Sequence, residues 1–118
     1  MTTLSRQTPS DKALRASTAM LEMLWELCRE VIFYANQIDR TLLSDSDSTE
    51  LEAIERITIG YSISVQEIQS AEADKYPTPI ELRRFSNVVQ SHCFRALTAL
   101  QSTLNHQNGN NAPITLLE

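Results

Sequence analysis

A seven-residue spacing of apolar side chains limits the possible folds of this chain more than any other feature of its sequence. Successive positions seven residues apart carry Leu14, Leu21, Cys28, Ala35 and Leu42, with Leu24, Val31 and Ile38 between them. Seven residues make close to two helical turns, so these side chains fall on one side of a helix. A spacing kept over four repeats predicts a long helix that packs against others in a left-handed, coiled-coil-like manner.

Short polar segments indicate where the helices begin and end. Residues 78–81, Thr-Pro-Ile-Glu, combine a hydroxyl cap, a proline in the first turn and a glutamate that completes a capping box. Residues 8–11 and 49–52 follow a similar order, and polar or Pro- and Gly-containing segments follow each apolar pattern. The sequence therefore predicts helices over 9–43, 49–75 and 79–107 within one helical domain (9–107), a flexible N-terminal segment over 1–8 and a mobile C-terminal tail over 108–118.

Residues 57–66 fit two secondary structures. They alternate apolar and polar side chains and are rich in β-branched residues, which is typical of a strand. A single strand cannot satisfy its backbone hydrogen bonds, and no second strand pattern occurs in the chain. A helix, although weakened by Gly60, instead places one apolar set on a common face: Leu51, Ile54, Ile57, Tyr61, Val65 and Ile68. We predict a helix, and the alternative is a two-stranded ribbon formed with another chain.

These patterns define the expected fold. A chain of 118 residues matches one domain with a single core. The apolar stripe of residues 82–104 advances in steps of three, four and four, which relaxes the supercoil and favours a globular bundle over a rod. The prediction is an all-α, antiparallel up-down-up bundle of three long helices, which oligomerisation would complete if the three helices leave an apolar surface uncovered.

The distribution of charged residues along the sequence restricts the classes of partner that the chain can bind. The net charge is −5, and residues 44–76 carry eight acidic and two basic side chains. Such an acidic segment argues against nucleic-acid binding, which requires clustered Lys and Arg. The two lysines, Lys12 and Lys75, form no polybasic membrane patch. With no signal-peptide pattern and two cysteines inside helical apolar patterns, the expected location is the cytoplasm.

Residues that could carry catalysis are sparse. Gly60 and Gly109, the two glycines, cannot form a glycine-rich phosphate loop. His92 and His106 lack the Glu three positions earlier that a bundle di-iron site requires. We therefore expect a protein that is not an enzyme and that has no cofactor, no metal and no small-molecule substrate.

One short motif suggests a different function. The segment 92–96, His-Cys-Phe-Arg-Ala, resembles the phospho-accepting site of histidine-phosphotransfer domains, with a basic residue three positions after the histidine. Ala96 replaces the glycine that is usual in that family. The resemblance implies a signalling module in which His92 is the phospho-acceptor, and this is the alternative to a purely protein-binding function.

Four large apolar side chains lie off the predicted core: Phe33, Ile59, Ile63 and Phe94. Their helical neighbours, three, four and seven residues away, are mostly charged or polar. Helical bundles usually bury such side chains against a partner. We therefore expect a protein–protein interaction module, of adaptor, small-chaperone or inhibitor type, whose partner is a second copy, with a homodimer as the expected assembly, another protein, or both. In overall build it is similar to the small acidic helical chaperones of bacterial secretion and flagellar systems.

Overall fold

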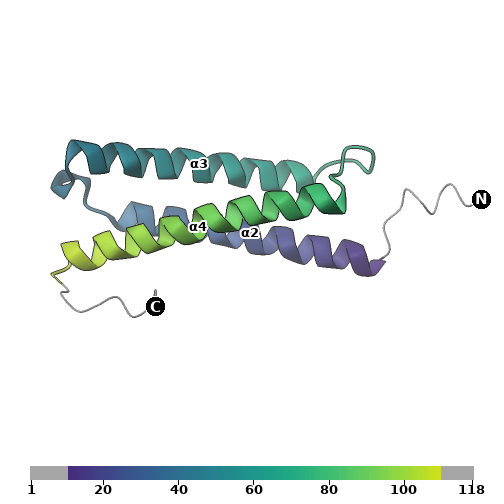
Figure 1. Cartoon of the computed structure of the whole chain (residues 1–118), viewed down its shortest axis with the longest axis horizontal. Coiled ribbons are helices and arrows are strands. Elements are labelled where there is room, and N and C mark those ends of the chain that lie inside the picture. Colours follow the sequence, from purple (N-terminus) through teal and green to yellow (C-terminus); the bar gives the residue numbers. More distant parts are fainter. Residues whose placement is uncertain (1–10, 110–118) are drawn as a thin grey trace, which may run out of the picture.

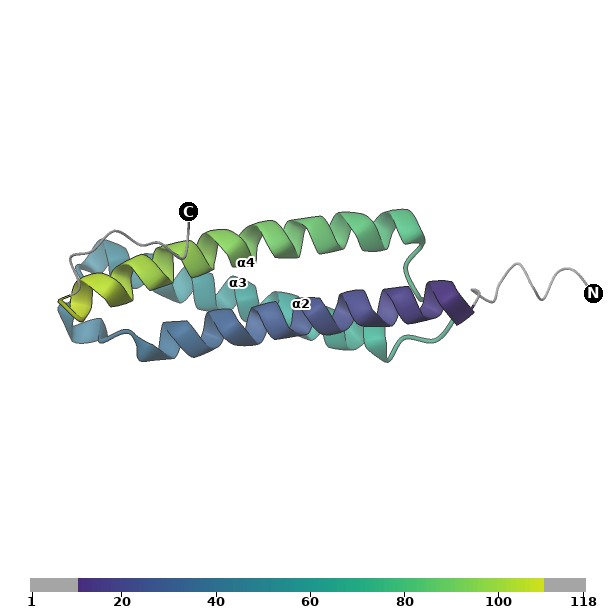
Figure 2. The same ribbon diagram turned by 90° about the horizontal axis from the view of Figure 1, so that it is seen from below.

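The computed structural model describes residues 11–109, which form three long α-helices. These are α2 (Asp11–Gln37), α3 (Asp45–Gln69) and α4 (Pro79–Gln107), with a short 3-10 helix, η1 (Arg40–Leu42), between α2 and α3. The helices lie side by side in up-down-up order (Figure 1), and α2 and α4 run in the same direction (Figure 2). The predicted fold class, an all-α three-helix bundle, is confirmed. Within residues 11–109, none of the helices has the length and apolar character needed to cross a membrane.

Helix α4 begins and ends as its sequence predicts. The Thr78 hydroxyl accepts a hydrogen bond from the backbone N–H of Glu81 at 3.2 Å, and the Glu81 carboxylate accepts one from the Thr78 N–H at 2.9 Å. This reciprocal pair is the capping box, and it satisfies two backbone donors that the first helical turn leaves free. The helix stops at Asn108, and Gly109 has a φ of +72°, a left-handed conformation that favours glycine.

The boundaries of the first two helices differ from the prediction. Helix α2 ends at Gln37 rather than at 43, because Asp39 accepts hydrogen bonds from the N–H and hydroxyl of Thr41 and starts η1. Helix α3 begins at Asp45 rather than at 49, because Ser44 caps it and two aspartates in its first turn suit the helix dipole. It ends at Gln69 rather than at 75, since residues 70–75 offer no large apolar side chain to the core. The predicted start at residue 9, the segment 1–8 and most of the tail lie outside residues 11–109.

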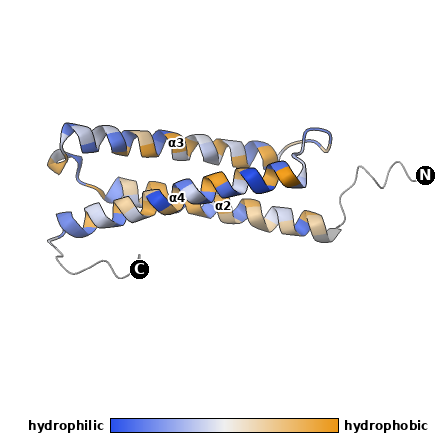
Figure 3. Ribbon diagram, in the orientation of Figure 1, coloured by the Kyte–Doolittle hydropathy of each residue, from blue (hydrophilic) through white to orange (hydrophobic). Residues whose placement is uncertain are grey.

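The core is organised around α2, which packs closely against both other helices, whereas α3 and α4 approach each other at fewer points. The middle of the predicted seven-residue pattern is buried, but its ends, Leu14 and Leu42, are 46% and 64% exposed. Apolar and polar residues alternate along each helix (Figure 3). The buried positions on α2 are Leu21, Leu24, Cys28, Val31, Ala35 and Ile38.

The segment 57–66 lies within α3, so the strand alternative is wrong and the predicted helix is confirmed. The face that α3 buries is largely the predicted one, because Leu51 and Val65 are buried and Ile54, Tyr61 and Ile68 pack against the core. The exceptions are Ile57, which is 43% exposed, and Thr58, which is buried in line with Leu51 and Val65. The prediction missed Thr58 because it is polar.

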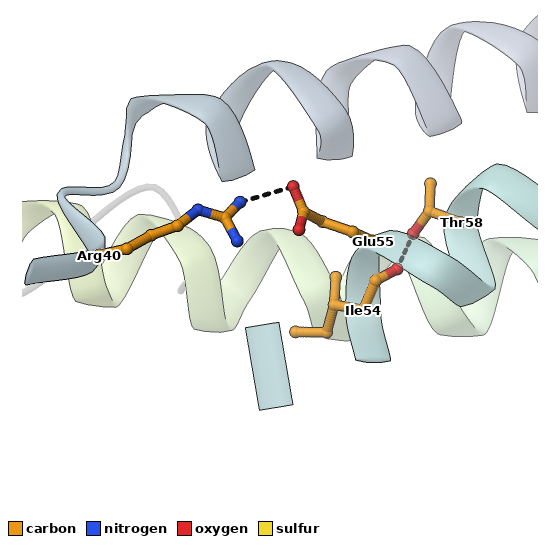
Figure 4. A network of polar contacts seen from close by, with 4 residues as sticks. All are labelled: Arg40, Ile54, Glu55 and Thr58. Carbon is orange, nitrogen blue, oxygen red and sulfur yellow. Dashed lines mark hydrogen bonds and ion pairs between the residues drawn. The ribbon is translucent and has the colours of Figure 1, made fainter. Parts of the chain in front are cut away.

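Polar contacts hold the end of the bundle at which η1 lies. The Asp39 N–H donates to the side-chain oxygen of Gln107 at 3.0 Å, and the Gln107 amide donates back to the Asp39 carbonyl at 3.0 Å. Arg40 forms an ion pair with Glu55 of α3, with 2.6 Å between nitrogen and oxygen (Figure 4). The turn after α2 is thereby tied to both α3 and α4.

Gly60 gives a direct test of the helical assignment of residues 57–66. A Cβ added there meets no atom within 4 Å, so Gly60→Ala should raise the free energy of unfolding by about 0.5–1 kcal/mol. Urea denaturation followed by circular dichroism measures the change. Gly109→Ala is the matched control and should lower stability, because its φ of +72° strains an alanine. A loss of stability in Gly60→Ala would contradict the helical assignment.

Candidate functional site

The seam between α3 and α4 contains a small polar and aromatic cluster. The Thr58 hydroxyl oxygen lies 2.8 Å from Nε2 of His92 and 2.6 Å from the carbonyl oxygen of Ile54 (the latter contact is drawn in Figure 4). The ring of Tyr61 stands edge-on to His92, with centroids 5.4 Å apart, and to Phe85, with centroids 6.4 Å apart. These residues connect two helices that otherwise make few close approaches.

The hydrogen bonds of Thr58 determine which nitrogen of His92 carries the proton. A threonine hydroxyl has one proton to donate and lone pairs to accept with. Because Thr58 donates that proton to the Ile54 carbonyl, it must accept from His92. Neutral His92 is therefore protonated on Nε2, and its Nδ1 is the nitrogen that takes up a second proton.

This geometry bears on the predicted phospho-acceptor. His92 is half-buried, and its Nε2–H is engaged with Thr58. Burial, with a smaller effect of the Arg95 charge, holds the pKa of His92 below its ordinary value. Phosphorylation of Nε2 would break this hydrogen bond to Thr58, so the observed contacts do not favour phosphotransfer through that nitrogen.

The two cysteines face each other across the core. Cys28 of α2 and Cys93 of α4 are 1% and 0% exposed, and both are free thiols. A hydrogen bond between the two thiols, together with burial, raises the pKa of Cys93. Both therefore act as small apolar core residues. Within residues 11–109, no three His, Cys, Asp or Glu side chains are grouped so that they could hold a metal ion.

All four side chains predicted to lie off the core are exposed. The exposed fraction is 58% for Phe33, 49% for both Ile59 and Ile63, and 53% for Phe94. Each is large and apolar, so each leaves apolar surface in contact with water. Their positions on the three helices decide which of them share a surface.

Phe33, Ile59 and Ile63 lie on the side of the bundle formed by α2 and α3. Tyr61 points toward α4, and residues two positions apart on a helix point about 200° apart, so Ile59 and Ile63 point away from α4. The neighbouring Ser62 lines a shallow hollow together with Phe33, and the other lining residues are Trp25, Cys28, Arg29, Ile32 and Asn36. The ring of Phe33 is also supported edge-on by Tyr34, at 5.4 Å between centroids.

Phe94 belongs to a different surface. His92 points toward Thr58 of α3, so Phe94, two residues later, points away from α3. The structure thus separates the four residues into a set of three and a single phenylalanine on another side of the bundle.

The two surfaces also differ in charge. Around Phe33, Ile59 and Ile63 the exposed charged side chains are mostly glutamates, and this surface is called the acidic face. It carries Glu22, Glu26, Glu30, Glu52 and Glu67, with Arg29 and Arg56 among them. The exposed surface of α4, called the basic face, carries Arg83, Arg84 and Arg95; Arg95 directly follows Phe94, whereas Arg83 and Arg84 lie about 15 Å from it along the helix.

Some of these features were not predicted from the sequence. The hollow beside Phe33 combines residues of two helices and depends on how α2 and α3 pack. Thr58 was missed because polar residues are seldom placed in a core from sequence alone. The basic face has a visible signal in the sequence, the three arginines of residues 83–95, but the structure is needed to show that all three are exposed.

Fold and surface chemistry thus define a three-helix bundle with mostly acidic exposed side chains on α2 and α3, exposed arginines on α4, and exposed apolar side chains on all three helices. Comparison of the chain with family models, with curated proteins and with solved structures gives no match.

The position of His92 predicts how stability depends on pH. Its pKa in the folded chain lies below the ordinary 6.5 that applies on unfolding. As pH falls below 6.5, the unfolded chain therefore binds a proton before the folded chain does, and the free energy of unfolding decreases. His92→Gln, whose amide can still donate to Thr58, should flatten this dependence between pH 7.5 and pH 5.

Urea denaturation at three pH values in this window measures the effect. His106 is present in both proteins and cancels in the comparison. Asp39 and Glu81, whose lowered pKa values reflect their hydrogen bonds to Thr41 and Thr78, titrate below this window. Equal slopes for the wild type and His92→Gln would contradict the description of the seam.

Proposed function

We propose that this protein is a non-enzymatic protein–protein interaction module, of adaptor, small-chaperone or inhibitor type, that binds through its acidic face. The observation that carries the proposal is the placement of Phe33, 58% exposed, in a hollow that Ser62 of α3 also lines, with Ile59 and Ile63, each 49% exposed, on that same helix. Monomeric proteins usually keep contiguous apolar surface small, and larger patches mark binding sites. An apolar centre ringed by glutamates has the composition of an interface with a polar rim.

Burial of these side chains against a partner favours specific binding. Full burial of a Phe or Ile side chain stabilises an association by about 1.5–3 kcal/mol, and a few central apolar residues usually supply most of the binding energy. Phe33 is the expected anchor because Tyr34 restricts its ring before binding. A restricted ring loses less conformational entropy when a partner covers it.

The proposed partner is a second copy of the chain, another protein, or both. The glutamates of the acidic face disfavour nucleic acid and anionic membranes by charge. Buried free thiols at Cys28 and Cys93 suit a reducing compartment, so the cytoplasm is the proposed location.

Serine substitutions of Ile59 on α3 and of Phe33 on α2 test the acidic face. Ile59→Ser should weaken self-assembly, because it removes an apolar side chain from the proposed contact, and Phe33→Ser should weaken it more. Ile57→Ser is the matched control, since Ile57 is similarly exposed, at 43%, but points to the other side of α3. Light scattering after size-exclusion chromatography, over a hundredfold range of concentration, measures the assembled mass.

Circular dichroism of each variant separates loss of binding from loss of fold. All three variants should keep the helical signal of the wild type. If Phe33→Ser unfolds the chain, Phe33 has a structural role and the proposal fails. It also fails if Ile57→Ser changes the assembled mass as much as Ile59→Ser does.

A further inference from the structure

The two exposed apolar surfaces are complementary to each other in charge. On the basic face, Arg83, Arg84 and Arg95 are exposed, and the one acidic residue of α4, Glu81, is engaged in the capping box. Helix α4 therefore presents three exposed positive charges, and one of them, Arg95, directly follows Phe94, which is 53% exposed.

The acidic face has the opposite balance. Its arginines are partly compensated within the chain, because Arg29 pairs with Glu26 at 3.1 Å. Along α3, Glu52, Arg56, Ile59, Ile63 and Glu67 follow one another at helical spacings of three and four, so the two isoleucines lie between glutamates on a single stripe. On α2, Glu22 and Glu30 are exposed and are in no ion pair within residues 11–109.

This arrangement opposes a symmetric contact between identical faces. In a two-fold dimer each residue patch meets itself, so the acidic face would place glutamates against glutamates. Like charges brought together at an interface weaken association, whereas opposite charges favour and orient it. Two basic faces would repel each other for the same reason.

We propose that the chain binds a second copy head to tail, with the basic face of one copy on the acidic face of the next. This inference rests on the proposed function and names its partner and its geometry. Phe94 of one copy then covers the apolar surface of Phe33, Ile59 and Ile63 on the other, and Arg84 and Arg95 lie among the glutamates. One acidic face and one basic face then stay free at the two ends of the assembly. The contact therefore extends into open chains or closes into a ring rather than stopping at a two-fold dimer.

A complementation experiment distinguishes head-to-tail from symmetric assembly. Phe33→Ser damages the acidic face and leaves the basic face intact, and Phe94→Ser does the reverse. Each variant alone should be monomeric at concentrations where the wild type assembles, with association at least about tenfold weaker. An equimolar mixture should form a complex of two chains, one of each variant, and should grow no further. Light scattering and native mass spectrometry measure the mass and composition.

A charge variant keeps the test independent of the phenylalanines. The double variant Arg84→Glu, Arg95→Glu changes exposed side chains only and should also be monomeric alone. Mixed with Phe33→Ser, it should form a complex of two chains, because its intact acidic face can bind the intact basic face of Phe33→Ser. Mixed with Phe94→Ser it should stay monomeric, since neither protein then has a functional basic face. Raising the ionic strength from about 0.05 M to about 0.5 M should weaken wild-type assembly, since salt screens the attraction.

Three results would overturn the head-to-tail arrangement while leaving the proposed function in place. These are a wild-type chain that stays monomeric over the whole concentration range, a Phe94→Ser variant that assembles like the wild type, and a mixture of the two serine variants that stays monomeric. Failure of the proposed function has a different signature, in which Phe33→Ser and Ile59→Ser assemble as strongly as the wild type. Circular dichroism on every variant confirms that the helices are intact before its mass is interpreted.

Discussion

Burial of one face of α2 is the interaction on which the rest of the structure depends. Its apolar side chains repeat every seven residues, and both other helices pack against that face. Each fully buried apolar side chain contributes about 1.5–3 kcal/mol, so this shared face supplies most of the favourable packing energy. The contact between the thiols of Cys28 and Cys93 lies within it and shows how closely α2 and α4 approach.

Because α2 buries the apolar faces of both α3 and α4, these two helices need not pack tightly against each other. Their seam contains a polar contact, Thr58 with His92, and the edge-on ring of Tyr61. A buried hydroxyl is stable there because Thr58 both donates, to the Ile54 carbonyl, and accepts, from His92. The same contacts orient α3 and α4 about their own axes, and so determine which residues point outward.

That orientation separates the exposed apolar residues into two surfaces. Ile59 and Ile63 lie two positions from Tyr61, and Phe94 lies two positions from His92. Two positions correspond to a rotation of about 200° around a helix, so the directions of Tyr61 and His92 determine those of the exposed residues. The charges are also divided, because glutamates predominate among the exposed charged side chains around the isoleucines, and three exposed arginines lie on α4 with Phe94. In the proposed head-to-tail contact, one small bundle carries both halves of the interface.

The sequence by itself determined the three helices, most of the α2 face and both ends of α4, because these depend on local periodicity and on caps made by neighbouring residues. It also identified four side chains, among them Phe33 and Phe94, that proved to be exposed. The end of α2, the start of α3 and the burial of Thr58 in place of Ile57 were predicted wrongly. Each of these depends on a contact or a rotation that local patterns do not record.

Only the tertiary structure decided which exposed residues belong together. Helical spacing places Ile59, Ile63 and Phe94 on faces of their own helices, but the relative rotation of those helices is set by contacts between residues far apart in the chain, such as Thr58 with His92. The sequence of one helix holds no information about the direction in which a second helix faces it. Which exposed apolar and charged residues share a surface is therefore decided only when the bundle is assembled.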